Sequence, residues 1–73
     1  MSKADKMLLD LGYKTTKTEW GDIEMVKDRY ESMKIWNGYH GEVYIGKTEI
    51  GESSPFTIEE FIAVNEKLKE MVF

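Results

Sequence analysis

The chain has 73 residues, of which 41% are hydrophobic and 33% charged, with a net charge of -4 at pH 7. This length corresponds to one small domain and excludes a second domain or a large catalytic cleft. The sequence holds no apolar run of the roughly 18 residues that span a membrane. Without cysteine, it also excludes disulfides, thiolate metal sites and thiol nucleophiles.

The first predicted element is a short helix over residues 2–11. Its apolar residues recur at helical spacing, and Gly12 stands where a left-handed residue commonly ends a helix. The stretch contains Asp10 instead of an uninterrupted apolar signal core followed by small residues. We therefore expect a cytoplasmic protein.

After the first helix the apolar period changes from 3.6 to two, which predicts short strands. Turns are expected at Gly21-Asp22, over residues 28–31 and at Asn37-Gly38. The last of these is compatible with a tight two-residue hairpin or with a longer loop. Residues 46–54 form a polar loop, with a brief extension over 48–50 as an option. The four predicted strands cover residues 13–20, 23–27, 33–36 and 43–45.

The last element is a helix that begins with a capping box, in which Thr57 and Glu60 satisfy each other's backbone amides. On a helical wheel its apolar residues occupy one half, and Glu59, Ala63, Glu66 and Glu70 occupy the other. We expect the apolar half to pack on the strands. It consists of Ile58, Phe61, Ile62, Val64, Leu68, Met71 and Val72.

These elements predict a single α+β domain over residues 1–73. Its order is helix, four-stranded antiparallel meander, helix, because short links between strands favour a meander. Both helices are expected on one face of the sheet, where they bury alternate strand residues. The predicted core on that face is Ile23, Met25, Met33, Ile35, Val43 and Ile45.

The same alternation places aromatic residues on the opposite face of the sheet. Trp36 and Tyr44 would point outward with Val26, and Tyr30 and Tyr39 would lie near the rim. Because interfaces are enriched in aromatic residues, one interpretation is a partner-binding surface. The other is an ordinary exposed face on which cross-strand aromatic pairs stabilise the sheet. A homodimer that forms through this face would be consistent with both interpretations.

The acidic excess is concentrated before the last helix. Residues 48–60 hold four glutamates and no basic residue, so this segment has the same net charge as the whole chain. Acids in a first turn complement the helix dipole, whereas the functional interpretation is an acidic surface for a basic partner. Direct nucleic-acid binding is disfavoured because the basic residues are scattered. The candidate acidic contacts are Glu49, Glu52 and Glu59.

Residues 41–48 match the phosphate-binding-loop pattern G-x-x-x-x-G-K-[ST], which requires a strand before it and a helix after it. Here the middle of the match is itself a predicted strand, so we interpret it as accidental. His40 is the only histidine, and no clustered metal-ligand spacing exists. We therefore expect no catalytic residue, metal or cofactor, and no enzymatic activity.

Several segments at the two ends of the chain resemble short proteins of phages and prophages of Gram-positive bacteria. They are Ala4-Asp5-Lys6-Met7, Leu11-Gly12-Tyr13, Thr57-Ile58-Glu59-Glu60 and Asn65-Glu66-Lys67-Leu68-Lys69-Glu70. The resemblance implies a phage accessory gene working in a bacterial host cell, and it transfers no site residues.

Two functions follow from these features. The first is a protein-interaction module, with a host protein or a second copy as partner, that uses the aromatic sheet face. The alternative is an inhibitor of a host defence nuclease or other nucleic-acid enzyme that acts through the acidic surface. Only the second predicts binding that collapses as salt concentration rises.

Overall fold

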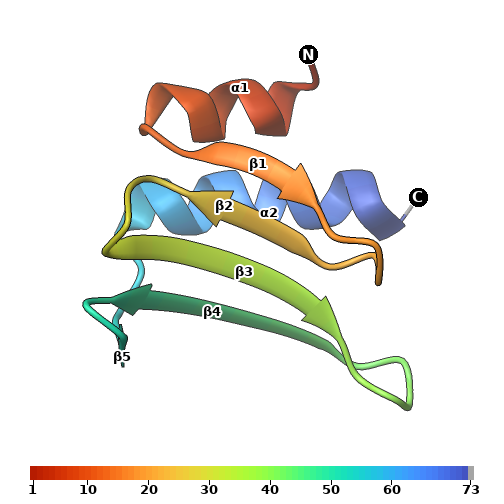
Figure 1. The fold of residues 1–73 in the computed structure, drawn as a ribbon. Coiled ribbons are helices and arrows are strands. Elements are labelled where there is room, and N and C mark those ends of the chain that lie inside the picture. The colour runs from red at the N-terminus through yellow and green to blue at the C-terminus, as the bar shows by residue number, and fades with distance from the viewer. Residues whose placement is uncertain (73) are drawn as a thin grey trace.

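The computed structural model describes residues 1–72, with the backbone alone described at Val72. The strands form one antiparallel sheet in chain order, with a helix at each end of the chain (Figure 1). The predicted α+β class is confirmed, and a fifth short strand extends the predicted meander. The elements are α1 (Lys3–Asp10), β1 (Lys14–Lys17), β2 (Ile23–Val26), β3 (Glu31–Asn37), β4 (Val43–Glu49), β5 (Glu52–Ser53) and α2 (Ile58–Val72).

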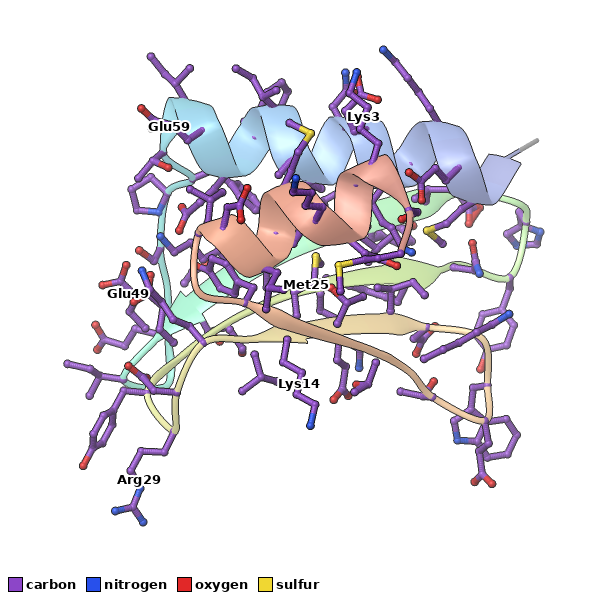
Figure 2. All side chains as sticks on the ribbon, turned by 90° about the horizontal axis from the view of Figure 1, so that it is seen from above. Lys3, Lys14, Met25, Arg29, Glu49 and Glu59 are labelled. Atoms are coloured by element: carbon purple, nitrogen blue, oxygen red, sulfur yellow. The ribbon has the colours of Figure 1, made fainter. Side chains whose placement is uncertain are left out.

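The molecule has two layers, with the helices on one side of the sheet (Figure 2). The helices run antiparallel, so that the start of α1 lies beside the end of α2 (Figure 1). Lys67 Nζ lies 2.9 Å from Asp5 Oδ1, and the Ala4 amide donates to Glu70 Oε2 at 2.9 Å. Over residues 1–72, neither helix has the length and apolar character needed to cross a bilayer.

The helix caps confirm the signals in the sequence. Ser2 Oγ accepts from the Asp5 amide at 3.1 Å at the start of α1. At the start of α2, Thr57 Oγ1 accepts from the Glu60 amide at 3.1 Å, and Glu60 Oε1 accepts from the Thr57 amide at 2.9 Å. This reciprocal capping box fixes where α2 begins and holds the Glu60 carboxylate at the N-terminus of the helix.

The core between the layers contains four of the six strand residues that were predicted for it. Val43 and Ile45 are each more than a third exposed, although they face the helices in register with Asn37 and Ile35. The reason is their position at the edge of the sheet, because β5 pairs only with Thr48 and Glu49. The buried hydrophobic residues of the core cluster are Leu8, Tyr13, Ile23, Met25, Met33, Ile35, Ala63 and Val64.

The predicted packing face of α2 is correct in its second half and wrong in its first. Val64 is buried, and Leu68 and Met71 pack against the core as expected, while the side chain of Val72 lies outside the described residues. Ala63, placed on the solvent half of the wheel, is fully buried, whereas Ile58, Phe61 and Ile62 are exposed. The helix is rotated because Glu60 is also turned inward, where it meets Lys47 of β4 at 2.7 Å. A buried charge needs a partner, and this requirement outweighs the apolar wheel.

Candidate functional site

Trp36 and Tyr44 form a stacked pair on the outer face of the sheet. They are register partners on β3 and β4, with ring centroids 5.8 Å apart and an interplanar angle of 26°. The Trp36 ring lies over Gly46, where a Cβ atom would come within 3.3 Å of it. Glycine at that position therefore lets the indole lie flat on the strand. Tyr44 remains exposed beside it.

The hairpin between β3 and β4 extends this pair with a third aromatic residue. The Gly38 amide donates to the Glu42 carbonyl at 2.8 Å and closes a loop over residues 39–41, in which Gly41 has φ +86°. The longer of the two turns that the sequence allowed is therefore formed. Tyr39, in this loop, is fully exposed.

A shallow pocket of about 430 Å³ joins the loop to the stacked pair. Glu42 contributes a carboxylate to it, and that carboxylate accepts from the His40 amide at 3.2 Å. The side chains that line the pocket combine three aromatic rings with one acid, an imidazole and an amide. They belong to Trp36, Asn37, Tyr39, His40, Glu42 and Tyr44.

Tyr30, the fourth predicted aromatic contact, lies elsewhere. It belongs to the turn between β2 and β3, at the far end of β3 from the β3–β4 hairpin (Figure 1). There the Tyr30 carbonyl accepts from the Ile50 amide at 2.7 Å, and the Arg29 guanidinium lies 5.7 Å from the Tyr30 ring centroid. We therefore define the aromatic surface as Trp36, Tyr39 and Tyr44.

The predicted acidic segment is divided between the interior and the surface. Glu60 is buried, and Glu49 Oε1 lies 3.2 Å from Lys47 Nζ, so both neutralise the same lysine. Glu52 on β5 and Glu59 in the first turn of α2 are exposed. Of the three candidate acidic contacts, Glu49 is therefore paired with Lys47, whereas Glu52 and Glu59 are not.

The buried cluster around Lys47 was not predicted from the sequence. Lys47 Nζ lies 2.7 Å from Glu60 Oε1 and 3.2 Å from Glu31 Oε2, in addition to Glu49. The Tyr13 hydroxyl donates to Glu60 Oε2 at 2.5 Å and lies 3.2 Å from Glu31 Oε2. One signal could have revealed it: Lys47 follows Val43 and Ile45 at alternate positions, which places a lysine on the core side of β4.

The pKa values of Glu60, Lys47 and Tyr13 are displaced from their ordinary values. Burial alone would raise the pKa of the Glu60 carboxyl, but hydrogen bonds from Lys47, the Thr57 amide and Tyr13 outweigh it and lower the pKa to about 2. Burial would lower the pKa of Lys47, but hydrogen bonds to three carboxylates raise it above its ordinary value. Burial and the bond to Glu60 raise the pKa of Tyr13.

None of these three groups is tuned to exchange a proton near neutral pH, which general acid-base catalysis requires. The cluster instead joins α2 to β3, to β4 and to Tyr13, which directly precedes β1. Its lysine belongs to the phosphate-loop match over residues 41–48, most of which forms β4. Lys47 is turned toward carboxylates on the helix side, which does not fit phosphate binding.

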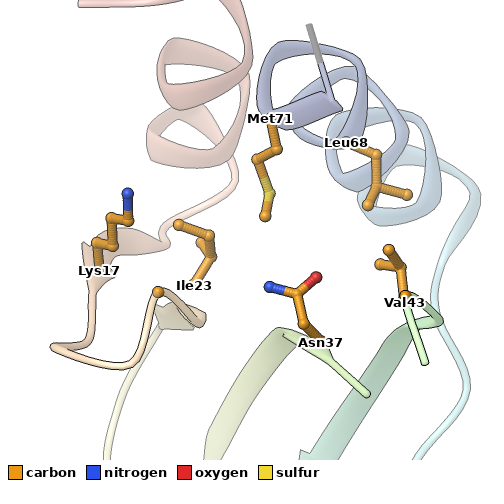
Figure 3. A pocket seen from close by; sticks show the side chains of 8 residues that line it. Lys17, Ile23, Asn37, Val43, Leu68 and Met71 are labelled. Atoms are coloured by element: carbon orange, nitrogen blue, oxygen red, sulfur yellow. The ribbon is translucent and has the colours of Figure 1, made fainter. Parts of the chain in front are cut away.

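A second opening lies between the layers at the C-terminal end of α2 (Figure 3). Its volume is about 520 Å³, and Lys17, Ile23, Asn37, Val43, Leu68 and Met71 line it. No predicted site residue is among them. Within residues 1–72, no three His, Cys, Asp or Glu side chains are grouped to hold a metal ion.

Known proteins give no further guide to these sites. Comparison with protein-family models, with curated proteins and with solved structures returned no match. The geometry of the aromatic surface and of the Lys47 cluster is therefore the basis for assigning a function.

Proposed function

We propose that this protein is a non-enzymatic binding module that engages a protein partner through the aromatic surface of Trp36, Tyr39 and Tyr44. The observation that carries the proposal is the stacked Trp36–Tyr44 pair, which lies on the outer sheet face beside the fully exposed Tyr39. Aromatic residues in such positions supply much of the binding energy at protein interfaces.

A purely structural role explains less of this surface. A cross-strand aromatic pair stabilises a sheet by about 0.2–1 kcal/mol, which accounts for Trp36 and Tyr44. It does not account for Tyr39, whose side chain packs on nothing. Most other outward-facing positions of the sheet are polar, so the aromatic pair is an exception on this face. These polar neighbours are Lys14, Thr16, Glu24, Ser32, Lys34 and Thr48.

The pocket also indicates what kind of partner side chain it would receive. Aromatic faces attract a cation, and the Glu42 carboxylate in the same pocket would pair with it. An arginine fits best, because its planar guanidinium can stack on a ring and bond a carboxylate at once. We therefore expect the partner to insert a basic side chain between Tyr39 and Tyr44.

The acidic alternative has less support. Glu60 and Glu49 are engaged with Lys47, which leaves Glu52 and Glu59 to form an acidic surface. Two exposed carboxylates are a small electrostatic footprint for competing with a nucleic acid. A phage origin and a partner in the bacterial cytoplasm complete the proposal, and these two parts rest on the sequence resemblance.

Capture of bacterial lysate proteins on the immobilised chain tests the proposal. We compare the native chain with Tyr39→Ser and with Tyr30→Ser, a matched variant at the other end of β3. A partner that is retained in high salt by the native chain and Tyr30→Ser, but lost by Tyr39→Ser, is expected. Loss in high salt and with Glu52→Gln or Glu59→Gln would favour the acidic surface, and equal retention by both tyrosine variants would contradict the proposal.

A further inference from the structure

The outward face of α2 carries apolar side chains that the sheet does not cover. Ile58 is 77% exposed, Phe61 59% and Ile62 48%. Ile62 also borders a groove of about 280 Å³ between α1 and α2, together with Met7 and Leu11. This is an apolar surface of the kind that marks an interface.

Polar residues continue the same line along the helix. Ile58, Ile62, Asn65 and Lys69 follow one another at intervals of four, three and four residues, which places them on one side of α2. Glu59 flanks the start of this line. The line is therefore apolar and acidic in its first half, and polar and basic in its second.

The exposed charges of the helical layer follow the same order, because Asp5 and Glu70 at the second end both lie within 4 Å of Lys67. Because the helices are antiparallel, Asp10 at the end of α1 lies near Glu59, with both lining the groove. Lys3 at the start of α1 lies toward the other end of the layer, where α2 ends (Figure 2). Lys69 is 3.4 Å from Glu66 but its side chain is 63% exposed, so a second carboxylate can reach it.

We propose that two copies of this chain associate through their helical layers around a two-fold axis, with the two α2 helices antiparallel. An axis at the level of Val64 places the Ile62 residues of the two copies on either side of it, about one helical turn apart, so that both lie at the centre of the interface. It also places Glu59 of each copy opposite Lys69 of the other, because both lie five residues from position 64. A surface with opposite charges at its two ends is self-complementary under this symmetry.

The size of the molecule supports a second copy as the occupant. A standard interface takes about 800 Å² from each partner. The chain exposes 5376 Å² and measures 29 × 27 × 23 Å, so such an interface occupies one whole face. The helical face supplies an apolar centre and a charged rim of both signs. The sheet faces then lie on the outside of the dimer, where each aromatic surface stays free.

Solution mass by light scattering tests the apolar centre. The native chain is expected at twice 8.5 kDa. Ile62→Lys should raise the dissociation constant about 100-fold or more, since each dimer carries the substitution twice. Ile50→Lys is the matched control at an exposed isoleucine of the β4–β5 turn and should leave the mass unchanged. Native chain that remains at 8.5 kDa at about 1 mM overturns the inference, because even weak dimers form there.

Charge reversal tests the orientation of the two helices. Glu59→Lys alone and Lys69→Glu alone should each weaken the dimer about tenfold in low salt, because each sets like charges opposite one another. An equimolar mixture of the two variants should form a heterodimer with native affinity, since both ion pairs are then restored. A mixture that associates no better than either variant alone overturns the antiparallel arrangement.

The dimer and the aromatic surface can fail independently. Trp36→Ser should leave the dimer intact, and Ile62→Lys should leave partner capture intact. If Trp36→Ser splits the dimer instead, the copies meet through their sheet faces and the helical interface is wrong.

Discussion

The two faces of the β3–β4 strand pair differ in which kinds of side chain they bury and which they expose. On the helix side, Lys47 is buried among Glu31, Glu49 and Glu60. On the outer side of the same two strands, Tyr44 is exposed and stacks on the half-buried Trp36. A buried lysine and an exposed aromatic pair thus lie on opposite faces of the same strands, each in the less usual environment for its residue type.

The buried lysine and the exposed aromatic residues have different physical explanations. The buried lysine is tolerated because its ammonium group has three carboxylate partners and Glu60 has further donors in Tyr13 and the Thr57 amide. No comparable requirement for the fold holds Tyr39 and Tyr44 at the surface. The Lys47 cluster should therefore contribute most to stability, and the aromatic surface should contribute most to binding.

The largest expected effect separates the faces directly. Lys47→Met should lower the free energy of unfolding by about 3–5 kcal/mol, because it leaves the buried Glu60 carboxylate without a cation. Lys34→Met is the matched change on the outer face, where Lys34 is half-exposed and 3.9 Å from Asp22. It should cost less than about 1 kcal/mol. Urea denaturation of both variants measures the contrast, and equal losses would show that the buried cluster has no special role.

Acid should weaken the inner face next. The folded-state pKa of Glu60 is about 2, below its ordinary value of 4.5. A depressed pKa contributes stability that is present above pH 4.5 and is lost as the pH falls toward 2. The loss is roughly 3 kcal/mol, from the free energy per pKa unit. Denaturation at pH 2 to 6 should show this loss in the native chain, and Glu60→Gln should flatten that part of the profile.

The caps, the α+β class and the outward placement of Trp36 and Tyr44 could be predicted because they follow from local patterns. The rotation of α2 could not, since it depends on a pair 13 residues apart, Lys47 and Glu60. A helical wheel that considers only hydrophobicity places Glu60 on the solvent side. The position of Tyr30 relative to the aromatic surface was also missed, because its distance depends on the length of β3, which was predicted too short at both ends.

The stacked pair on the outer face should affect stability less than either inner change. Tyr44→Ser removes one ring of the pair and should cost about 1 kcal/mol. A double-mutant cycle with Trp36→Ser isolates the stacking free energy from the loss of each ring alone. A coupling of more than about 2 kcal/mol would mean that the pair is primarily structural, which would remove the contrast between the faces.

The last expected effect is as small as that of Tyr44→Ser and has the opposite sign. Ile50 has φ +53° and Gly51 φ +77° in the two-residue turn between β4 and β5, a left-handed conformation that a β-branched residue adopts at a cost. Ile50 is also 79% exposed, so its side chain gains little from burial. Ile50→Asn should therefore raise the free energy of unfolding by about 1 kcal/mol.

Ile58→Asn provides the control for that gain, because Ile58 is equally exposed but begins α2, where the backbone is right-handed and asparagine has no advantage over isoleucine. The thermal midpoint should rise for the first variant and stay level or fall for the second. A fall for both would mean that Ile50 packs in the folded state. A rise for Ile50→Asn alone would show that the chain keeps a strained apolar residue in an exposed turn, as it keeps Tyr39, for a reason other than folding.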